Sequence, residues 1–335
     1  MKRLLVALSF LITFGAVAAG ALFVYAKERF EAPGPLDSRT VVRVPAGVGV
    51  QDIALRLSEG GVIDDPLVFV LAARLTGTAS DLKAGEFAFP PGASLKDALN
   101  IVVTGQAVAR RITVPEGIRT ATVVANLRAR EGLTGVIETV PAEGSLLPET
   151  YQYHWGDSRT ALLARMQAAM DETLDALWPA RAADLPFDTP EEAVTLASIV
   201  EKETAVAEER ALVAGVFVNR LRRGMRLQSD PTVRYAVTRG GTSLNRPLTR
   251  ADLAVEDPYN TYRRAGLPPG PIANPGRASL EAVLNPAATD YIYFVADGSG
   301  GHAFAKTLDG HNANVRAWRR IRDAARERET GEGGD

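Results

Sequence analysis

The longest uncharged run of the chain covers residues 4–26 and follows Lys2 and Arg3. A helix of this length is sufficient to cross a hydrocarbon core of about 30 Å. A cleaved signal peptide usually has a shorter apolar region, although the small residues at 16–21 resemble a peptidase site. The run therefore predicts a transmembrane anchor over 4–26, with residues 1–3 in the cytoplasm and the folded mass on the other side of the membrane.

The apolar pattern after the anchor predicts a small module of alternating strands and helices. Residues 27–39 contain proline and glycine and are typical of a linker. Residues 40–44 have the alternation of a strand, and the apolar residues of 51–59 share one face of a helix. The same pattern predicts a helix over 65–75 that begins at an Asp-Pro pair, a strand and turn over 85–92, and a helix over 95–104. We bound this module at residues 40–108.

A short sequence pattern occurs twice. The segment Val44-Pro-Ala-Gly47 is followed by apolar residues at helical spacing, and so is Val114-Pro-Glu-Gly117. Each copy predicts a strand, a Pro-Gly turn and an amphipathic helix. The match is short, so reuse of a common local motif explains it as well as an internal repeat does.

The remaining residues, 109–328, predict a larger α+β domain whose core begins at about residue 141. A long helix is expected to begin after Thr189, a favourable cap, because proline follows at the first helical position. Residues 222–276 are rich in Gly, Pro, Asn, Thr and Tyr, which predicts loops that carry a binding site on a rigid scaffold. The other expected elements are a helix over 158–178, a strand over 291–295, a basic helix over 312–326 and a disordered tail over 329–335.

Composition narrows the chemistry that this domain can perform. Hydrophobic residues make up 46% of the 335 and charged residues 23%, as in ordinary globular proteins, and the net charge of −2 does not indicate nucleic-acid binding. The chain has no cysteine, which excludes disulfides and thiolate chemistry. Its three histidines form no HExxH motif, and a GxSxG motif is also absent from the sequence. Carboxylates are therefore the strongest candidates for catalysis.

Two glutamates lie in the stretch 196–205 of the helix predicted after Thr189. Glu203 continues the stripe formed by apolar residues of the preceding turns, and desolvation there would raise the pKa of its carboxyl. A general acid that acts near neutral pH needs such a shift. Glu201 lies about 160° away around the helix. The pattern alone leaves three readings open, namely Glu203, Glu201 and a solvated surface triplet.

Several blocks of the sequence resemble one family. The segment 197–204, Ala-Ser-Ile-Val-Glu-Lys-Glu-Thr, is similar to the signature of the MltG (YceG-like) family of endolytic murein transglycosylases. The anchor and the first module also match the layout of that family, so the resemblance extends over nearly the whole chain. Further blocks follow in the family's order at 216–221, 225–232 with Tyr235, 259–262, 266–276, 293–295, 301–304, and Thr307 with 311–312.

The resemblance implies an activity and a catalytic residue. The family's single catalytic glutamate is carried over to Glu203, with Glu201 as the alternative. Other lytic transglycosylases have a hydroxyl residue after this glutamate, and Thr204 has that position here. The implied substrate is nascent peptidoglycan, cut between MurNAc and GlcNAc with formation of a 1,6-anhydro end, which would terminate glycan elongation. The resemblance implies no metal and no other cofactor.

The resemblance also implies a cellular setting. The module at 40–108 resembles LysM, a β-α-α-β fold that binds peptidoglycan, although a spacer of similar fold that binds nothing fits the sequence equally well. The expected location is the bacterial inner (cytoplasmic) membrane, with a single pass and the catalytic domain on the periplasmic side. The expected partners are glycan strands and the glycan-polymerising penicillin-binding proteins.

Loop residues supply candidate substrate contacts, and two other functions stay open. A hydrolytic muramidase would need a second carboxylate, for which Asp230 and Glu149 are candidates. A catalytically silent peptidoglycan-binding scaffold would need none. We expect His311 and Asn312 to bond loop backbone, and we do not expect His302 and His311 to pair as a metal site. The side chains that suit amino sugars, each of which turn formation explains nearly as well, are Gln228, Asp230, Tyr259, Asn260 and Tyr262.

Overall fold

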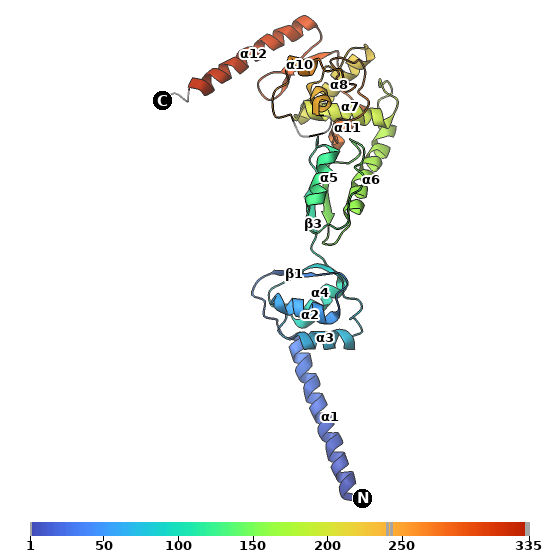
Figure 1. Ribbon diagram of the computed structural model, residues 1–335, viewed down its shortest axis with the longest axis vertical. Helices are drawn as coiled ribbons and strands as arrows, with labels where there is room; N and C mark the ends of the chain where they lie inside the picture. The colour runs from blue at the N-terminus through green and yellow to red at the C-terminus, as the bar shows by residue number, and fades with distance from the viewer. Residues whose placement is uncertain (1, 239–240, 242–243, 332–335) are drawn as a thin grey trace. The chain divides into compact units, whose positions relative to one another are not determined.

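The computed structural model of the protein describes residues 2–238, 241 and 244–331. These residues form a mixed α+β structure that begins with a long apolar helix (Figure 1), which confirms the predicted fold class at that level. The chain divides into two compact units. Unit 1 holds the residues up to Arg110 together with 132–134 and 152–157, and unit 2 holds the others.

Helix α1 (Lys2–Glu31) contains a 23-residue segment, Ser9–Glu31, that is long and apolar enough to cross a membrane. The apolar window of this segment is not buried by the rest of the chain. The helix continues beyond residue 27, where the sequence predicted a linker. The reason is that the residues after the apolar run are compatible with a helix, and the first helix-stopping residue is Pro33.

Unit 1 contains the strands and helices that the sequence predicted. Strands β1 and β2 pair in antiparallel fashion, with Thr40 opposite Phe89. Asp65 caps α3 by accepting hydrogen bonds from two backbone N–H groups, and Ser94 caps α4 through a capping box. The order of elements is β1 (Thr40–Val44), α2 (Val50–Glu59), α3 (Pro66–Leu75), β2 (Gly85–Phe89) and α4 (Leu95–Thr104).

Unit 2 is mainly helical and contains two small two-stranded sheets. One pairs β3 with β4, and the other pairs β5 with β6 in antiparallel fashion. Its first elements are β3 (Arg110–Thr113), α5 (Thr120–Ala129), β4 (Thr150–Tyr153) and α6 (Arg159–Leu177). They are followed by α7 (Pro190–Glu203), α8 (Arg210–Arg222), α9 (Asp230–Thr238), α10 (Arg250–Leu253), α11 (Arg277–Leu284), β5 (Tyr293–Ala296), β6 (His302–Ala305) and α12 (Leu308–Gly331).

Helix α7 is the central helix of unit 2. It begins, as predicted, with Thr189 as the cap, and Glu192 completes a capping box with it. All residues from Ala193 to Val200 are buried, so the helix is enclosed on every side rather than along one stripe. Helices α8 and α11 pack against it and supply much of the core. Both ends of α7 emerge from this core, and the last turn carries both candidate glutamates.

Three predicted segments differ in the structure. The region 222–276 is not loop throughout, because it contains α9 and α10. These helices are too short for the hydrophobic pattern of a helix to be recognised in the sequence. The strand predicted over 291–295 is β5, which starts at Tyr293. Helix α12 is longer than the predicted helix and includes 329–331, the start of the predicted disordered tail. The last part of that tail lies outside the described residues.

Candidate active site

The Glu203 side chain projects from the last residue of α7 into a cluster of polar groups. Thr204 ends the helix in an extended conformation, and its hydroxyl accepts a hydrogen bond from the backbone N–H of Val206. The hydroxyl of Ser229 donates to Oε1 of Glu203 across 2.5 Å. Ser229 is almost fully buried, so this donor has a fixed position next to the carboxyl.

Two residues of the predicted set lie beside this pair. Tyr262 donates its hydroxyl to Oδ1 of Asp230 across 2.7 Å. The segment before Tyr262 is joined to the loop of Ser229, because the Ser229 N–H donates to the Thr261 hydroxyl at 3.0 Å. Burial first, and then the hydrogen bond to Asp230, raises the pKa of the Tyr262 phenol. The structure thus brings Glu203, Asp230 and Tyr262 together.

The surroundings of Glu203 change its acidity in the direction that acid catalysis requires. Burial of the carboxyl is the main cause that raises the pKa of Glu203 to about 7. The hydrogen bond from Ser229 lowers this pKa, the negative charge of Asp230 raises it, and the positive charge of Arg220 lowers it. A carboxyl with this pKa is protonated in part at neutral pH, so it can donate a proton and later accept one.

Arg220 of α8 supports this cluster from within the core. Its Nε donates to the carbonyl of Ile292 at 2.7 Å, and its Nη1 donates to the carbonyl of Leu227 at 2.7 Å. The guanidinium also lies over the ring of Tyr293, 5.4 Å from its centroid. Burial lowers the pKa of Arg220. By holding the backbone at Leu227, this buried cation positions the loop that presents Ser229.

The Glu203 carboxyl lines a cavity of about 630 Å³ inside unit 2. Ligand sites of this volume are common in proteins. Arg119 is one of the residues that line it, with Nη2 donating to the Thr238 hydroxyl at 2.8 Å and its guanidinium over the ring of Tyr235. The other lining residues include Gly117, Ile118 and Thr122 around the start of α5, Lys202 of α7, Pro231 and Arg234 of α9, and Leu244 and Ile272 from other segments.

Glu201 points to different partners from those of Glu203. Its Oε2 accepts hydrogen bonds from the backbone N–H of Gly276 at 3.0 Å and from the Ser279 hydroxyl at 2.7 Å. These donors belong to the N-terminus of α11, where Gly276 has no side chain to cap the helix. A carboxylate at this end of a helix satisfies free N–H groups and interacts favourably with the helix dipole. Glu201 therefore has a structural role as the cap of α11.

The other three residues predicted to contact substrate differ in how far their side chains are exposed. Gln228 is exposed and has a φ of 51°, a left-handed conformation that no other non-glycine residue among those described adopts. Tyr259 packs against Tyr235, with ring centroids 4.7 Å apart. Asn260 is 0% exposed, and its amide donates to two backbone carbonyls, at Leu253 and Val255. This engagement gives Asn260 a role in shaping the loop.

The two histidines that the sequence singled out have separate environments. His302 bonds Glu209 through both its backbone N–H, at 2.9 Å, and its Nδ1, at 2.7 Å. His311 stacks on Tyr293 with ring centroids 5.1 Å apart, and burial lowers its pKa. Both hydrogen bonds of His302 thus end on the carboxylate of Glu209, and Nδ1 of His311 is buried without a hydrogen-bond partner among the described residues.

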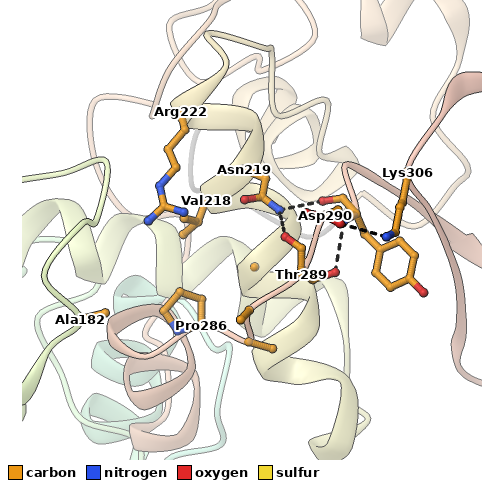
Figure 2. Close-up of a pocket in the computed structure, with 12 residues that line it drawn as sticks. Ala182, Val218, Asn219, Arg222, Pro286, Thr289, Asp290 and Lys306 are labelled. Carbon is orange, nitrogen blue, oxygen red and sulfur yellow. Dashed lines mark hydrogen bonds and ion pairs between the residues drawn. The ribbon is translucent and has the colours of Figure 1, made fainter.

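A second hollow in unit 2, of about 670 Å³, has a different character (Figure 2). The amide of Asn219 donates to the backbone carbonyls of Thr289, at 2.7 Å, and Tyr291, at 3.0 Å. Lys306 is paired with Asp290 at 2.9 Å, as the dashed lines in Figure 2 show. These polar groups hold the segment between α11 and β5 in place, so the Glu203 cavity is the better candidate for chemistry.

Sequence reasoning did not identify two residues of the site. Ser229 lies in the block at 225–232 and Arg220 in the block at 216–221, so their blocks were visible in the sequence. Neither has a spacing that marks it as a partner of Glu203. Their roles depend on contacts between segments that are far apart in the chain, such as those of Ser229 and Glu203, which are 26 positions apart.

Comparison with known proteins gives extensive matches. The sequence model of the YceG-like family matches residues 42–317. A Bacillus subtilis (strain 168) protein named endolytic murein transglycosylase is 33% identical over 328 residues, covering 88% of this chain and 89% of that protein. A Streptococcus pneumoniae (serotype 2, strain D39) protein of the same name is 30% identical over 357 residues, covering 92% of this chain. The chain spans 64% of the length of that streptococcal relative.

A solved structure gives a match of similar extent. The 2.6 Å crystal structure of a yceG-like protein from Listeria monocytogenes superposes with a TM-score of 0.50 and is 30% identical. The match covers 82% of this chain and 99% of the Listeria chain. The family match extends over most of the residues, from β1 in unit 1 to α12 in unit 2. The chain therefore belongs to the YceG-like family.

Proposed function

We propose that this protein is a membrane-anchored endolytic transglycosylase of peptidoglycan. It cleaves the bond between MurNAc and GlcNAc in nascent glycan strands, leaves 1,6-anhydro-MurNAc ends, and so terminates strand elongation. The observation that carries the proposal is the Glu203 carboxyl, whose pKa is raised to about 7 where it lines a cavity in unit 2. The names of the bacillar and streptococcal relatives support the reaction class.

Glu203 acts first as the general acid. Its carboxyl proton passes to the oxygen of the glycosidic bond, so that the GlcNAc side leaves as an alcohol when the bond to C1 of MurNAc breaks. Positive charge develops at C1 and the ring oxygen in this step. The resulting Glu203 carboxylate stabilises that charge, and the Ser229 hydroxyl fixes the carboxylate through its hydrogen bond.

Glu203 acts next as the general base. The C6 hydroxyl of the same MurNAc attacks C1, and its proton passes to the Glu203 carboxylate, which restores the starting carboxylic acid. Because the nucleophile is part of the substrate, much of the entropic barrier to its approach is already removed. The reaction therefore needs one carboxyl with a pKa near neutrality rather than the two carboxyls of an ordinary glycosidase.

Neighbouring residues are assigned to substrate binding. Asp230 and Tyr262 form a hydrogen-bonded pair beside Glu203 and provide contacts for sugar hydroxyl or acetamido groups. Tyr259 contributes an aromatic face with Tyr235, and Gln228 contributes an exposed amide at the neighbouring turn. We leave Asn260 out of this set, because its buried amide is already bonded to backbone carbonyls.

The N-terminal part gives the enzyme its location. Helix α1 is proposed to anchor the chain in the inner membrane with a single pass, so that unit 2 acts on the periplasmic side. The β-α-α-β order of β1, α2, α3 and β2 supports a LysM-like module, for which glycan strands are the proposed ligand. Glycan-polymerising penicillin-binding proteins are the proposed source of the nascent strands.

A hydrolytic muramidase is the second candidate, because Asp230 lies close enough to influence Glu203. In that reaction a second carboxylate activates water, and the product has a reducing MurNAc end instead of an anhydro end. Two features favour transglycosylation. Asp230 is already bonded to the Tyr262 hydroxyl, and the relatives are named transglycosylases.

The experiment is product analysis of purified glycan strands that have been incubated with the full-length protein. Mass spectrometry separates anhydro ends from reducing ends, which differ by one water. We expect anhydro ends from wild type and Glu201→Gln, and no products from Glu203→Gln. Reducing ends would identify a hydrolase and contradict the proposed reaction. Failure of the folded wild-type protein to cut any glycan would instead indicate a silent scaffold.

A further inference from the structure

Helix α3 of unit 1 is apolar on two opposite sides. Its inner side carries Phe69 and Ala73, both 0% exposed in the core of the unit. Its outer side carries Leu67, Leu71 and Leu75, which are 81%, 50% and 75% exposed. A surface helix usually turns polar residues outward, so three leucines spaced four residues apart form an exposed stripe that needs a partner.

The partner is indicated by the position of this stripe. Helices α1 and α3 line a common groove of about 430 Å³, whose walls are almost entirely apolar. Leu71 and Leu75 of α3 contribute to it together with Leu22 and Phe23 of α1. Figure 1 shows α3 at the end of unit 1 from which α1 emerges. The exposed leucines are therefore continuous with the apolar surface of the proposed anchor.

The depth of α3 relative to α1 is fixed by contacts near the end of α1. Phe30 packs against the core of unit 1. Arg29 forms an ion pair with Asp64 at 2.9 Å, and Glu31 forms one with Lys96 at 3.3 Å. Since α1 is one continuous helix up to Glu31, these contacts of its last turn join the proposed membrane segment directly to the module, and residues 32–39 follow as the connection to β1. A given depth of α1 in a bilayer therefore sets the depth of α3.

That depth places α3 at the membrane boundary. The groove reaches back along α1 as far as Ala19, which lies inside the uncharged run over 4–26. At a rise of 1.5 Å per residue, Ala19 lies about 10 Å below the end of that run. Interfacial helices insert their apolar faces to a depth of about 5–10 Å. The depth of Ala19 below the end of the uncharged run therefore matches the insertion depth of an interfacial helix.

We propose that α3 is a second membrane contact, lying in the outer leaflet's interface with its leucine stripe against lipid. The inference rests on the proposed membrane anchorage by α1. Arg74, exposed on α3 between Leu71 and Leu75 in sequence, has a side chain long enough to reach lipid phosphates. Two contacts hold unit 1 at a fixed tilt on the bilayer, whereas the α1 helix alone would leave it free to tilt.

Spin labels can test this inference, because the native chain has no cysteine. Full-length Leu71→Cys, Phe23→Cys and Val41→Cys variants are labelled and placed in vesicles of phosphatidylethanolamine and phosphatidylglycerol. Phe23 reports the anchor and Leu71 reports the proposed contact. Val41 is a matched control, since it is 50% exposed and belongs to β1, on the side of unit 1 away from α3 (Figure 1).

The measurement is the accessibility of each label to oxygen, which concentrates in lipid, and to a water-soluble nickel chelate. We expect the Leu71 label to lie about 5–10 Å below the lipid phosphates, the Phe23 label to lie in lipid, and the Val41 label to be open to the chelate. Leu75→Cys provides a second position on the stripe if labelling at Leu71 disturbs the groove.

Three other results would overturn the inference in distinguishable ways. A Leu71 label open to the chelate, with Phe23 in lipid, would leave the anchor standing and remove the second contact. A Phe23 label open to the chelate would remove the anchor and the inference with it. A Leu71 label shielded from both reagents would mean that protein covers the stripe, and dipolar broadening between labels would identify a second copy of this chain.

Discussion

The two sides of the last turn of α7 place similar carboxyls in different surroundings. On one side, Glu201 meets a backbone N–H and a hydroxyl at the start of α11. On the other side, Glu203 has one hydroxyl donor and the nearby negative charge of Asp230. Two donors at the start of a helix suit a structural cap, whereas burial, with the charge of Asp230 nearby, favours the protonated form of Glu203. The comparison shows how neighbours in sequence can take on structural and chemical roles.

The largest expected difference between the two glutamates is in catalysis. Replacing Glu203 with Gln removes the proton that the leaving oxygen needs, so the rate of strand cleavage should fall by about 10²–10⁴-fold. Glu201→Gln keeps an acceptor for the α11 donors and should retain most of the rate. Circular dichroism and the melting temperature serve as controls for folding. A larger loss of rate in Glu201→Gln than in Glu203→Gln would reverse the assignment.

The next difference is in stability. Glu201→Ala removes the acceptor for Gly276 and Ser279, which should lower the free energy of unfolding by about 1–3 kcal/mol. The measurement is the denaturant midpoint of the full chain in detergent. Glu208→Ala, at an exposed position a few residues later, should change stability by less than about 0.5 kcal/mol. Equal midpoints for the two variants would exclude the capping role of Glu201.

Glu203→Gln should have the opposite effect on stability, and only at higher pH. The folded-state pKa of about 7 lies above the ordinary 4.5, so the folded chain retains a proton that the unfolded chain releases. The stability contributed by the neutral carboxyl is therefore complete below about 4.5 and is lost as the pH rises through 7. We expect Glu203→Gln to be more stable than wild type by roughly 1–3 kcal/mol at pH 8 and about equal at pH 4. A destabilised variant at pH 8 would contradict this.

The smallest expected effects are shifts in the pH profile of cleavage. The rate of wild type should decline above about pH 7, as Glu203 loses its proton. Asp230→Asn removes a negative charge that raises this pKa, so the decline should begin at lower pH. Ser229→Ala removes a hydrogen bond that lowers the pKa, so the decline should begin at higher pH. Each shift should be about one pH unit or less, and shifts in the same direction would contradict the arrangement.

Local signals in the sequence predicted much of the fold. The start of α7 at Thr189 and Pro190, and the start of α3 at Asp65 and Pro66, follow from capping chemistry that needs only neighbouring residues. The twofold Val-Pro-x-Gly pattern likewise gave a strand, a turn and a helix in both copies. The copies differ in what surrounds them, since Gly117 lines the Glu203 cavity and Gly47 lies open in unit 1.

The sequence predicted less about the candidate site, because the site depends on contacts over long separations. Glu203 was proposed as the end of an apolar stripe, but α7 is buried on all sides from Ala193 to Val200, and the end of the helix is what places Glu203 beside the cavity. The partners of Glu201 lie 75 and 78 residues away, and Arg220 acts on carbonyls such as that of Ile292, 72 residues away. The spacing of apolar residues along one helix cannot predict partners that lie in distant segments of the chain.

The most direct test of the central assignment is a carboxyl titration of the full-length protein in detergent, with ¹³C-labelled glutamate followed by NMR. We predict that one glutamate of the wild type titrates near pH 7, and that this resonance is missing from Glu203→Gln and present in Glu201→Gln. If the resonance near pH 7 persists in Glu203→Gln, or if all glutamates titrate near 4.5, Glu203 does not hold a proton at neutral pH and the assignment is wrong.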